Sequence, residues 1–119
     1  MRRLLILTAM LALPATQALA EGDAAHGQQI YESRCIACHS PDANRVGPMH
    51  RGVFGRKAGS LANYTYSKAL KGTDFVWSED TLDKWLTNPQ ALVPGQKMNF
   101  RVTKPEDRAD IIAYLKTLQ

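Results

Sequence analysis

The sequence is short of the residues that build disulfide frameworks and metal clusters, since its 119 residues include only two cysteines and three histidines. A structural zinc site needs a tetrahedral set of nitrogen and sulfur ligands, and outside the cysteine motif only His26 and His50 are available. No apolar run approaches the ~20 residues of a membrane-spanning helix. Internal repeats, low-complexity segments and a concentrated basic stripe are also missing, so a repeat protein and a nucleic-acid binder are disfavoured.

Both cysteines lie in one short stretch, Cys35-Ile36-Ala37-Cys38-His39. This is the spacing of haem c attachment, in which two thiols add to the vinyl groups along one haem edge and the next residue lies under the iron. A thioredoxin-like redox dithiol, the main alternative, needs a βαβ setting that the sequence before Cys35 does not offer. A disulfide here would close too small a loop to stabilise much. We therefore expect one haem c, attached through Cys35 and Cys38.

Residues 1–20 have the pattern of a secretory signal peptide. Arg2-Arg3 precede an apolar run from Leu4 to Leu13, and the segment ends in Ala18-Leu19-Ala20. The run is too short to cross a bilayer, although an uncleaved anchor is the alternative. We expect export to the periplasm, cleavage after Ala20, no stable membrane insertion afterwards, and one domain over residues 21–119.

The charge of the remaining chain is only mildly positive. Cleavage would remove Arg2 and Arg3 and leave 13 basic and 11 acidic residues, a net charge of +2. This excess is compatible with a basic patch used for transient docking. A domain of 99 residues buries a modest core by itself, so a large apolar cofactor would supply much of the missing interior.

Helical periodicity and capping signals predict helices at both ends of the domain and in its second half. Residues 40–66 show little periodicity, and a loop of this length is explained if it wraps around a cofactor. Gly27, inside the first helix, indicates either a close crossing by another element or a glycine that the helix simply tolerates. The predicted segments are Asp23 to Arg34, Ser67 to Lys71, Ser78 to Thr87, and a helix from a Thr103–Glu106 capping box to about Leu118.

Motifs along nearly the whole of residues 21–119 match one family. They are Gly27 and Tyr31, the Cys35–His39 stretch, Gly47-Pro48, the run 52–59, Tyr66, Trp77, Asn88-Pro89, the run 94–98 and the run 108–116. On these residues the chain resembles class I cytochrome c, and it is most similar to the mitochondrial-type branch and its bacterial periplasmic relatives. The resemblance implies an all-α fold around a covalently bound haem. The first and last helices would cross, with Gly27 against the region of Tyr114 and Leu115.

The resemblance also implies roles for the matching residues. Cys35 and Cys38 would hold the haem, while His39 and Met98 would bind its iron from opposite sides. The Pro48 carbonyl would accept a hydrogen bond from His39, which fixes the tautomer of the imidazole. A neutral, soft thioether ligand favours ferrous iron and raises the reduction potential. A packing role is the alternative for Met98.

Four further residues match positions around the haem in the family. Arg56, Tyr66 and Trp77 match residues that hydrogen-bond the propionates, and Phe100 matches an aromatic residue at the haem edge. Without the resemblance, Arg56 and Trp77 are read as an exposed charge and a core aromatic residue. Met49 is the weaker candidate for the second iron ligand, because it directly follows Pro48.

Five positions depart from the family pattern and limit what it implies about the reduction potential. Trp85 stands where a tyrosine usually hydrogen-bonds the methionine sulfur, and an indole N–H is placed differently. His50 occupies a usually apolar position. The other departures are Arg51, Leu70 and Gln96.

The leading hypothesis is a soluble periplasmic electron carrier rather than an enzyme, monomeric and with both axial positions of one haem filled. Arg34, Arg45 and Lys97 would form a positive face for transient contact with acidic redox proteins. Two alternatives stay open: an enzyme with a labile Met98, and a haem subunit bound in a larger redox complex.

Overall fold

The computed structural model describes Ala12 and residues 22–119, so the predicted cleavage site lies outside the described residues. The described chain contains no strand, only an isolated antiparallel bridge between Lys57 and Val76. The predicted all-α class is therefore confirmed. No described helix has the length and apolar character to cross a membrane. The helices are α1 (Ala24–Arg34), α2 (Lys68–Lys71), α3 (Glu79–Thr87), α4 (Pro89–Leu92) and α5 (Pro105–Thr117).

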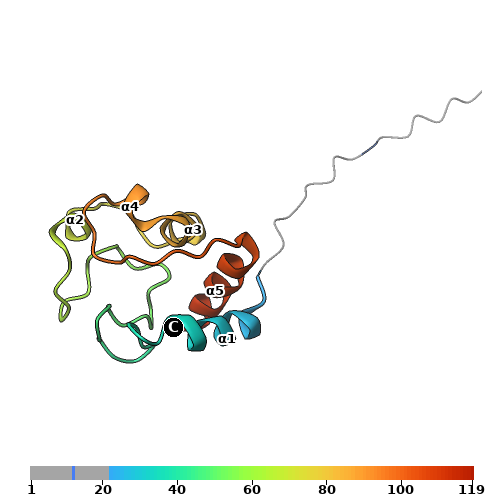
Figure 1. Ribbon diagram of the computed structural model, residues 1–119. Coiled ribbons are helices and arrows are strands. Elements are labelled where there is room, and N and C mark those ends of the chain that lie inside the picture. Colours follow the sequence, from blue (N-terminus) through green and yellow to red (C-terminus); the bar gives the residue numbers. More distant parts are fainter. Residues whose placement is uncertain (1–11, 13–21) are drawn as a thin grey trace, which may run out of the picture.

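Helices α1 and α5 pack directly against each other and form one side of the molecule (Figure 1). Gly27 is buried at their crossing, where an added Cβ would overlap the backbone carbonyl of Asp110. The expected contact with the region of Tyr114 and Leu115 is therefore wrong by about one helical turn. Tyr114 lies further along α5, where its ring packs edge-to-face against Tyr31 with a centroid distance of 5.2 Å.

The N-caps of α1 and α3 are confirmed. Asp23 accepts hydrogen bonds from the backbone N–H groups of Ala25 and His26, at 3.0 and 3.2 Å. Ser78 accepts from the backbone of Thr81, whose hydroxyl accepts in return from the Ser78 backbone, which completes a capping box. These side chains satisfy N–H groups that have no partner inside the helix.

The predicted Thr103–Glu106 capping box is wrong. Helix α5 begins at Pro105, and its N-cap Lys104 makes no side-chain capping bond. Proline suits the first helical position because it lacks the N–H that would need a partner, and it holds the preceding residue extended. Residues 103–106 therefore match the sequence pattern of a capping box, but the helix starts at Pro105 without a side-chain cap.

Helix α4 is not among the helices predicted from the sequence. Asn88 ends α3 and also caps α4, with its side chain accepting from the Ala91 backbone N–H at 3.4 Å. Pro89 stands in the first turn of α4. The Asn-Pro pair therefore ends one helix and begins another without an intervening loop.

Residues 35–67 contain no helix and form the long loop expected from the sequence. In Figure 1 this loop runs from the end of α1 around the lower side of the molecule to α2, facing α3 and α4. Gly52, Gly55 and Gly59 in this loop have positive φ angles of 76°, 89° and 70°, which glycine adopts without a steric cost. The loop closes one side of a cavity whose other walls come mainly from α1, α3, α5 and the non-helical segment 96–100.

Candidate functional site

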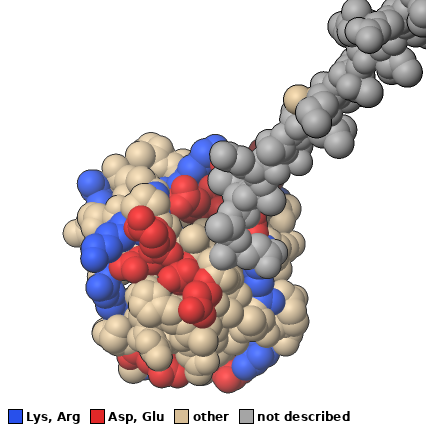
Figure 2. Space-filling model, turned by 90° about the vertical axis from the view of Figure 1, so that its right-hand side faces the viewer, with Lys and Arg blue, Asp and Glu red and all other residues tan. Residues whose placement is uncertain are grey.

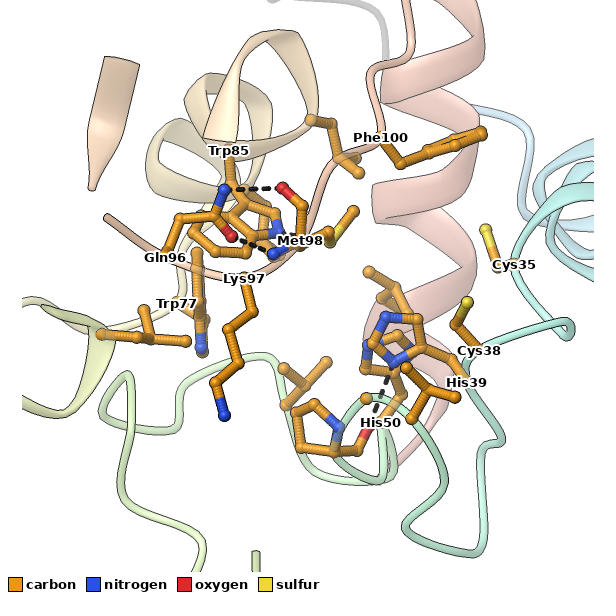
Figure 3. Close-up of a pocket in the computed structure, with 18 of the residues that line it drawn as sticks. Cys35, Cys38, His39, His50, Trp77, Trp85, Gln96, Lys97, Met98 and Phe100 are labelled. Carbon is orange, nitrogen blue, oxygen red and sulfur yellow. Dashed lines mark hydrogen bonds between the residues drawn. The ribbon is translucent and has the colours of Figure 1, made fainter. Parts of the chain in front are cut away.

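A cavity of about 430 Å³ lies between the helices and the long loop. This volume falls in the range of cofactor and small-molecule pockets. All nine residues predicted as site residues line it, although they are spread over much of the chain: Cys35, Cys38, His39, Pro48, Arg56, Tyr66, Trp77, Met98 and Phe100. In Figure 3, Met98 and Trp85 lie on one side of the open space and His39 on the other, with both cysteines at one edge.

The cysteine motif follows directly from α1. The Cys35 N–H donates to the Tyr31 carbonyl at 2.9 Å, and the His39 N–H donates to the Cys35 carbonyl at 2.8 Å, so the motif forms a turn that continues the helix. The two thiols are not joined in a disulfide. Burial raises the pKa of the Cys35 thiol to about 11. A redox dithiol needs a lowered thiol pKa, so this environment argues against that alternative.

The His39 imidazole is oriented by its backbone neighbours. Its Nδ1 donates to the Pro48 carbonyl across 3.2 Å, which leaves Nε2 with the lone pair. Burial lowers the pKa of His39, so the ring is neutral at pH 7. A Cβ added to Gly47 would overlap the ring, so glycine is required beside it. The result is a neutral imidazole in the tautomer that a metal binds.

Met98 is held by three side-chain hydrogen bonds. Trp85 donates from its indole Nε1 to the Met98 sulfur at 3.2 Å. The Gln96 side chain bonds both backbone groups of Met98, since its Nε2 donates to the carbonyl at 2.6 Å and its Oε1 accepts from the N–H. The backbone of Gln96 is in turn bound by Gln90 at 3.0 Å. The Trp85 indole thus reaches the sulfur, despite the different placement expected from its shape.

Arg56 carries an unpartnered donor at the cavity wall. Its Nη2 donates to the Met49 carbonyl at 3.0 Å. Its Nε is buried and is the one buried side-chain nitrogen or oxygen without a partner in the described chain. Leaving a buried charged donor unpaired is costly. An acidic group bound in the cavity would provide the acceptor, so Arg56 fits a haem with its propionates.

The remaining predicted site residues are Tyr66, Trp77 and Phe100, which differ in their contacts and in their exposure to solvent. The Tyr66 hydroxyl accepts from the Leu61 N–H at 3.1 Å. Trp77 is buried and packs edge-to-face against Trp85, with a centroid distance of 5.2 Å. Phe100 is 39% exposed, so its ring stands at the mouth of the cavity.

His50 and Gln96, which depart from the family pattern in the sequence, both make specific contacts in the structure. The His50 ring lines the cavity and stacks on the His39 ring. Gln96 clamps the Met98 backbone rather than facing solvent, and it is 5% exposed. Their chemical type was visible in the sequence, but no spacing rule indicates which atoms they bind.

The fold and the cavity together define a class: a small helical domain in which a Cys-x-x-Cys-His turn opens onto a cavity that takes a haem. The family model described as cytochrome c matches residues 24–119. The chain belongs to the cytochrome c family. It carries one covalently attached haem c, through its two cysteines, and it transfers electrons to and from redox partner proteins.

Relatives and a solved structure agree with this assignment. The chain is 46% identical to cytochrome c of Euglena viridis over 101 residues, which cover 82% of this chain and 99% of the relative. It is 48% identical to cytochrome c2 of Rhodomicrobium vannielii over 104 residues, covering 84% and 82% of the two chains. The structure of cytochrome cH from Methylobacterium extorquens superimposes with a TM-score of 0.77 at 44% identity, covering 81% and 99%.

Proposed function

We propose that this chain is an exported, periplasmic, monomeric electron carrier whose single haem iron is bound by His39 and Met98. One observation carries the proposal: a single cavity presents a neutral imidazole and a thioether from opposite sides, with both cysteines at its edge (Figure 3). His39 and Met98 would then hold the iron from both sides. No position is left for a substrate, so we infer that the protein is not an enzyme.

The chain's own residues set the properties of the site. A bound haem supplies the one-electron couple of its iron. Met98 offers a neutral sulfur that favours the ferrous state, and Trp85 donates a hydrogen bond to that sulfur. On the other side, the Pro48 carbonyl keeps the Nδ1 proton of His39 in place. We assign Arg56, Tyr66 and Trp77 to the propionates, in keeping with their positions on the cavity wall.

The mouth of the cavity is the proposed contact surface for redox partners. Phe100 is 39% and Val46 74% exposed there, and both line the cavity. Lys97 lines it as well and makes no ion pair in the described chain. Arg34, one of the three residues expected to form the positive face, lies 3.6 Å from Asp107 on α5 and is partly neutralised. We therefore place the docking charge mainly on Lys97 and Arg45.

Mass spectrometry and carbon monoxide binding test this proposal together. The periplasmic protein should begin at Glu21 and carry the added mass of one haem. Its reduced visible spectrum should not change under carbon monoxide, because both axial positions are filled. Met98→Ala is the positive control, since it should open the iron to carbon monoxide. A mature chain that retains Met1, or a wild-type iron that binds carbon monoxide readily, would contradict the proposal.

A further inference from the structure

A second imidazole lies directly against the candidate iron ligand. The rings of His50 and His39 are nearly parallel, with an interplanar angle of 20° and centroids 4.0 Å apart. Figure 3 shows the two rings overlapping on the cysteine side of the cavity. The Nδ1 of His50 is 2.8 Å from the Tyr31 hydroxyl. None of the roles assigned above uses His50 or Tyr31.

We propose that His50, held by Tyr31, is a positioning residue that fixes the plane of the His39 ring and thereby stabilises the oxidised state of the iron. The inference rests on the proposed function, in which His39 is an iron ligand.

The geometry shows why a second restraint on His39 matters. A hydrogen bond to the Pro48 carbonyl fixes the direction of Nδ1, but it leaves the ring free to turn about that line. The backbone of Gly47 is close enough to limit this rotation on one side. A flat ring stacked in parallel, as His50 is, opposes rotation over the whole ring face. Three neighbours therefore set the plane of the His39 ring: the Pro48 carbonyl, the Gly47 backbone and the His50 ring. Of these three, His50 is the one that stacks a ring on the flat face of His39.

Tyr31 determines where His50 can lie. It is 1% exposed, and its hydroxyl has no other hydrogen-bond partner in the described part of the chain. Its ring is wedged edge-to-face against Tyr114 of α5. A buried hydroxyl needs a partner, so the two side chains depend on each other. Tyr31 thereby anchors the His50 ring to the crossing of α1 and α5.

Because the side chain of His50 is an aromatic ring, the direction of its effect on the reduction potential can be derived. When the iron loses an electron, the imidazole bound to it gains positive character. The π-face of a neighbouring aromatic ring attracts positive charge. A neutral imidazole stacked on His39 therefore favours the oxidised state, whereas an aliphatic side chain of similar size would fill the space without this attraction. Removing the ring should raise the reduction potential.

Three variants of the haem-loaded protein distinguish the effect of the His50 ring on His39 from a general loss of packing. His50→Leu removes the ring but leaves the Tyr31 hydroxyl buried without a partner, so it should also lower the unfolding midpoint. The double variant Tyr31→Phe/His50→Leu removes both polar groups, and replacing both partners restores much of the stability. The double variant Tyr31→Phe/His50→Phe returns an aromatic ring to the stack. For each, the reduction potential and the paramagnetically shifted haem methyl resonances of the ferric protein are measured.

We expect both Leu variants to show the same upward shift in potential and the same changed haem methyl pattern, although their unfolding midpoints differ. The Phe double variant should move back toward the wild type. Wild-type methyl shifts and potential in Tyr31→Phe/His50→Leu would overturn the positioning role, as would changes that follow the unfolding midpoint instead of the ring. A wild-type spectrum without histidine and methionine ligation would overturn the proposed function itself.

Discussion

At the scale of single residues, the two candidate iron ligands are held by different kinds of neighbour. His39 depends on a backbone carbonyl at 3.2 Å and a stacked ring. Met98 depends on side chains, with Trp85 at its sulfur and Gln96 at its backbone. A donor at the sulfur withdraws electron density that would otherwise stabilise ferric iron. On the Met98 side, a single substitution at Trp85 should therefore change the electron density at the sulfur while both ligands are kept.

Trp85→Phe should lower the reduction potential, because the Met98 sulfur loses its hydrogen bond and donates more strongly to ferric iron. A hydrogen bond contributes about 0.5–1.5 kcal/mol net, and about 59 mV corresponds to a tenfold change in a one-electron equilibrium, so we expect a fall of roughly 20–65 mV by voltammetry. The lost ring volume should also cost about 1–3 kcal/mol of unfolding free energy.

Ile112→Val is the control for that loss of packing. Ile112 is buried in α5 but does not line the cavity. It should cost about 0.5–1.5 kcal/mol and leave the potential unchanged. An unchanged potential in Trp85→Phe would mean that the indole N–H has no influence on the iron.

The residue types of the site were readable from the sequence because covalent haem attachment demands a fixed spacing. The Cys-x-x-Cys-His turn could be recognised without a fold, whereas Met98 and Arg56 needed the family resemblance to stand out. The contacts of Trp85, Gln96 and His50 could not be predicted. They depend on how loops far apart in sequence approach each other, and a local pattern does not contain that information.

At the scale of elements, the crossing of α1 and α5 is tied at the beginning of α1 by one carboxylate. Asp110 of α5 accepts from the Asp23 backbone N–H at 2.7 Å and lies 2.6 Å from Nδ1 of His26. The hydrogen bond to Asp110 raises the pKa of His26, and nearby Asp107 and Asp23 act in the same direction. The same contact lowers the pKa of Asp110.

The stability supplied by this contact should therefore depend on pH. A raised His26 pKa means that the stabilisation is complete below the ordinary value of 6.5 and is lost as pH rises through the folded-state pKa. For Asp110, stabilisation is present above 3.8 and is lost as pH falls through its lowered pKa. Denaturant midpoints of the wild type and His26→Gln should differ most between these values and converge above neutral pH. A difference that does not change from pH 5 to pH 9 would contradict this account.

Elements with a strong local signal were predictable, and those decided by proline were not. Asp23 and Ser78 cap their helices as expected, because their side chains reach N–H groups within the same turn. The start of α5 and the existence of α4 both depend on a proline at the first turn, which can end or begin a helix. The exact crossing at Asp110 depends on α5 as a whole, and Gly27 alone indicates only that a crossing exists.

At the scale of the whole molecule, most acidic side chains of α3 and α5 are paired with basic side chains, so their charges largely cancel. Figure 2 shows acidic side chains gathered on one face with basic ones beside them. Of the six acidic residues on α3 and α5, five lie in ion pairs with neighbouring basic side chains: Glu79, Asp80, Asp83, Asp107 and Asp110. Paired surface charges project little net field. Lys97 at the cavity mouth makes no ion pair within residues 22–119 and therefore has more influence on an approaching partner than its share of the net charge suggests.

Lys97→Glu should slow bimolecular electron transfer to an acidic redox partner and weaken its dependence on ionic strength, because encounter is steered by charge near the contact. The effect should fade as salt shortens the screening length to about 8 Å at physiological ionic strength. Stopped-flow rates across a salt series measure it. Lys104→Glu is the matched control, since Lys104 is exposed and does not line the cavity. Equal rates and salt dependence for both variants would place docking elsewhere.

Proton NMR of the reduced holoprotein, with labelled methionine methyl groups, tests whether Met98 binds the iron opposite His39. A methionine bound to the iron lies against the haem plane, and the ring current moves its methyl resonance far upfield. Processed protein should contain only Met49 and Met98, so Met49→Leu is the matched control. We predict one far-upfield methyl in the wild type and in Met49→Leu, and none in Met98→Leu. An upfield methyl that survives in Met98→Leu and disappears in Met49→Leu would contradict the account.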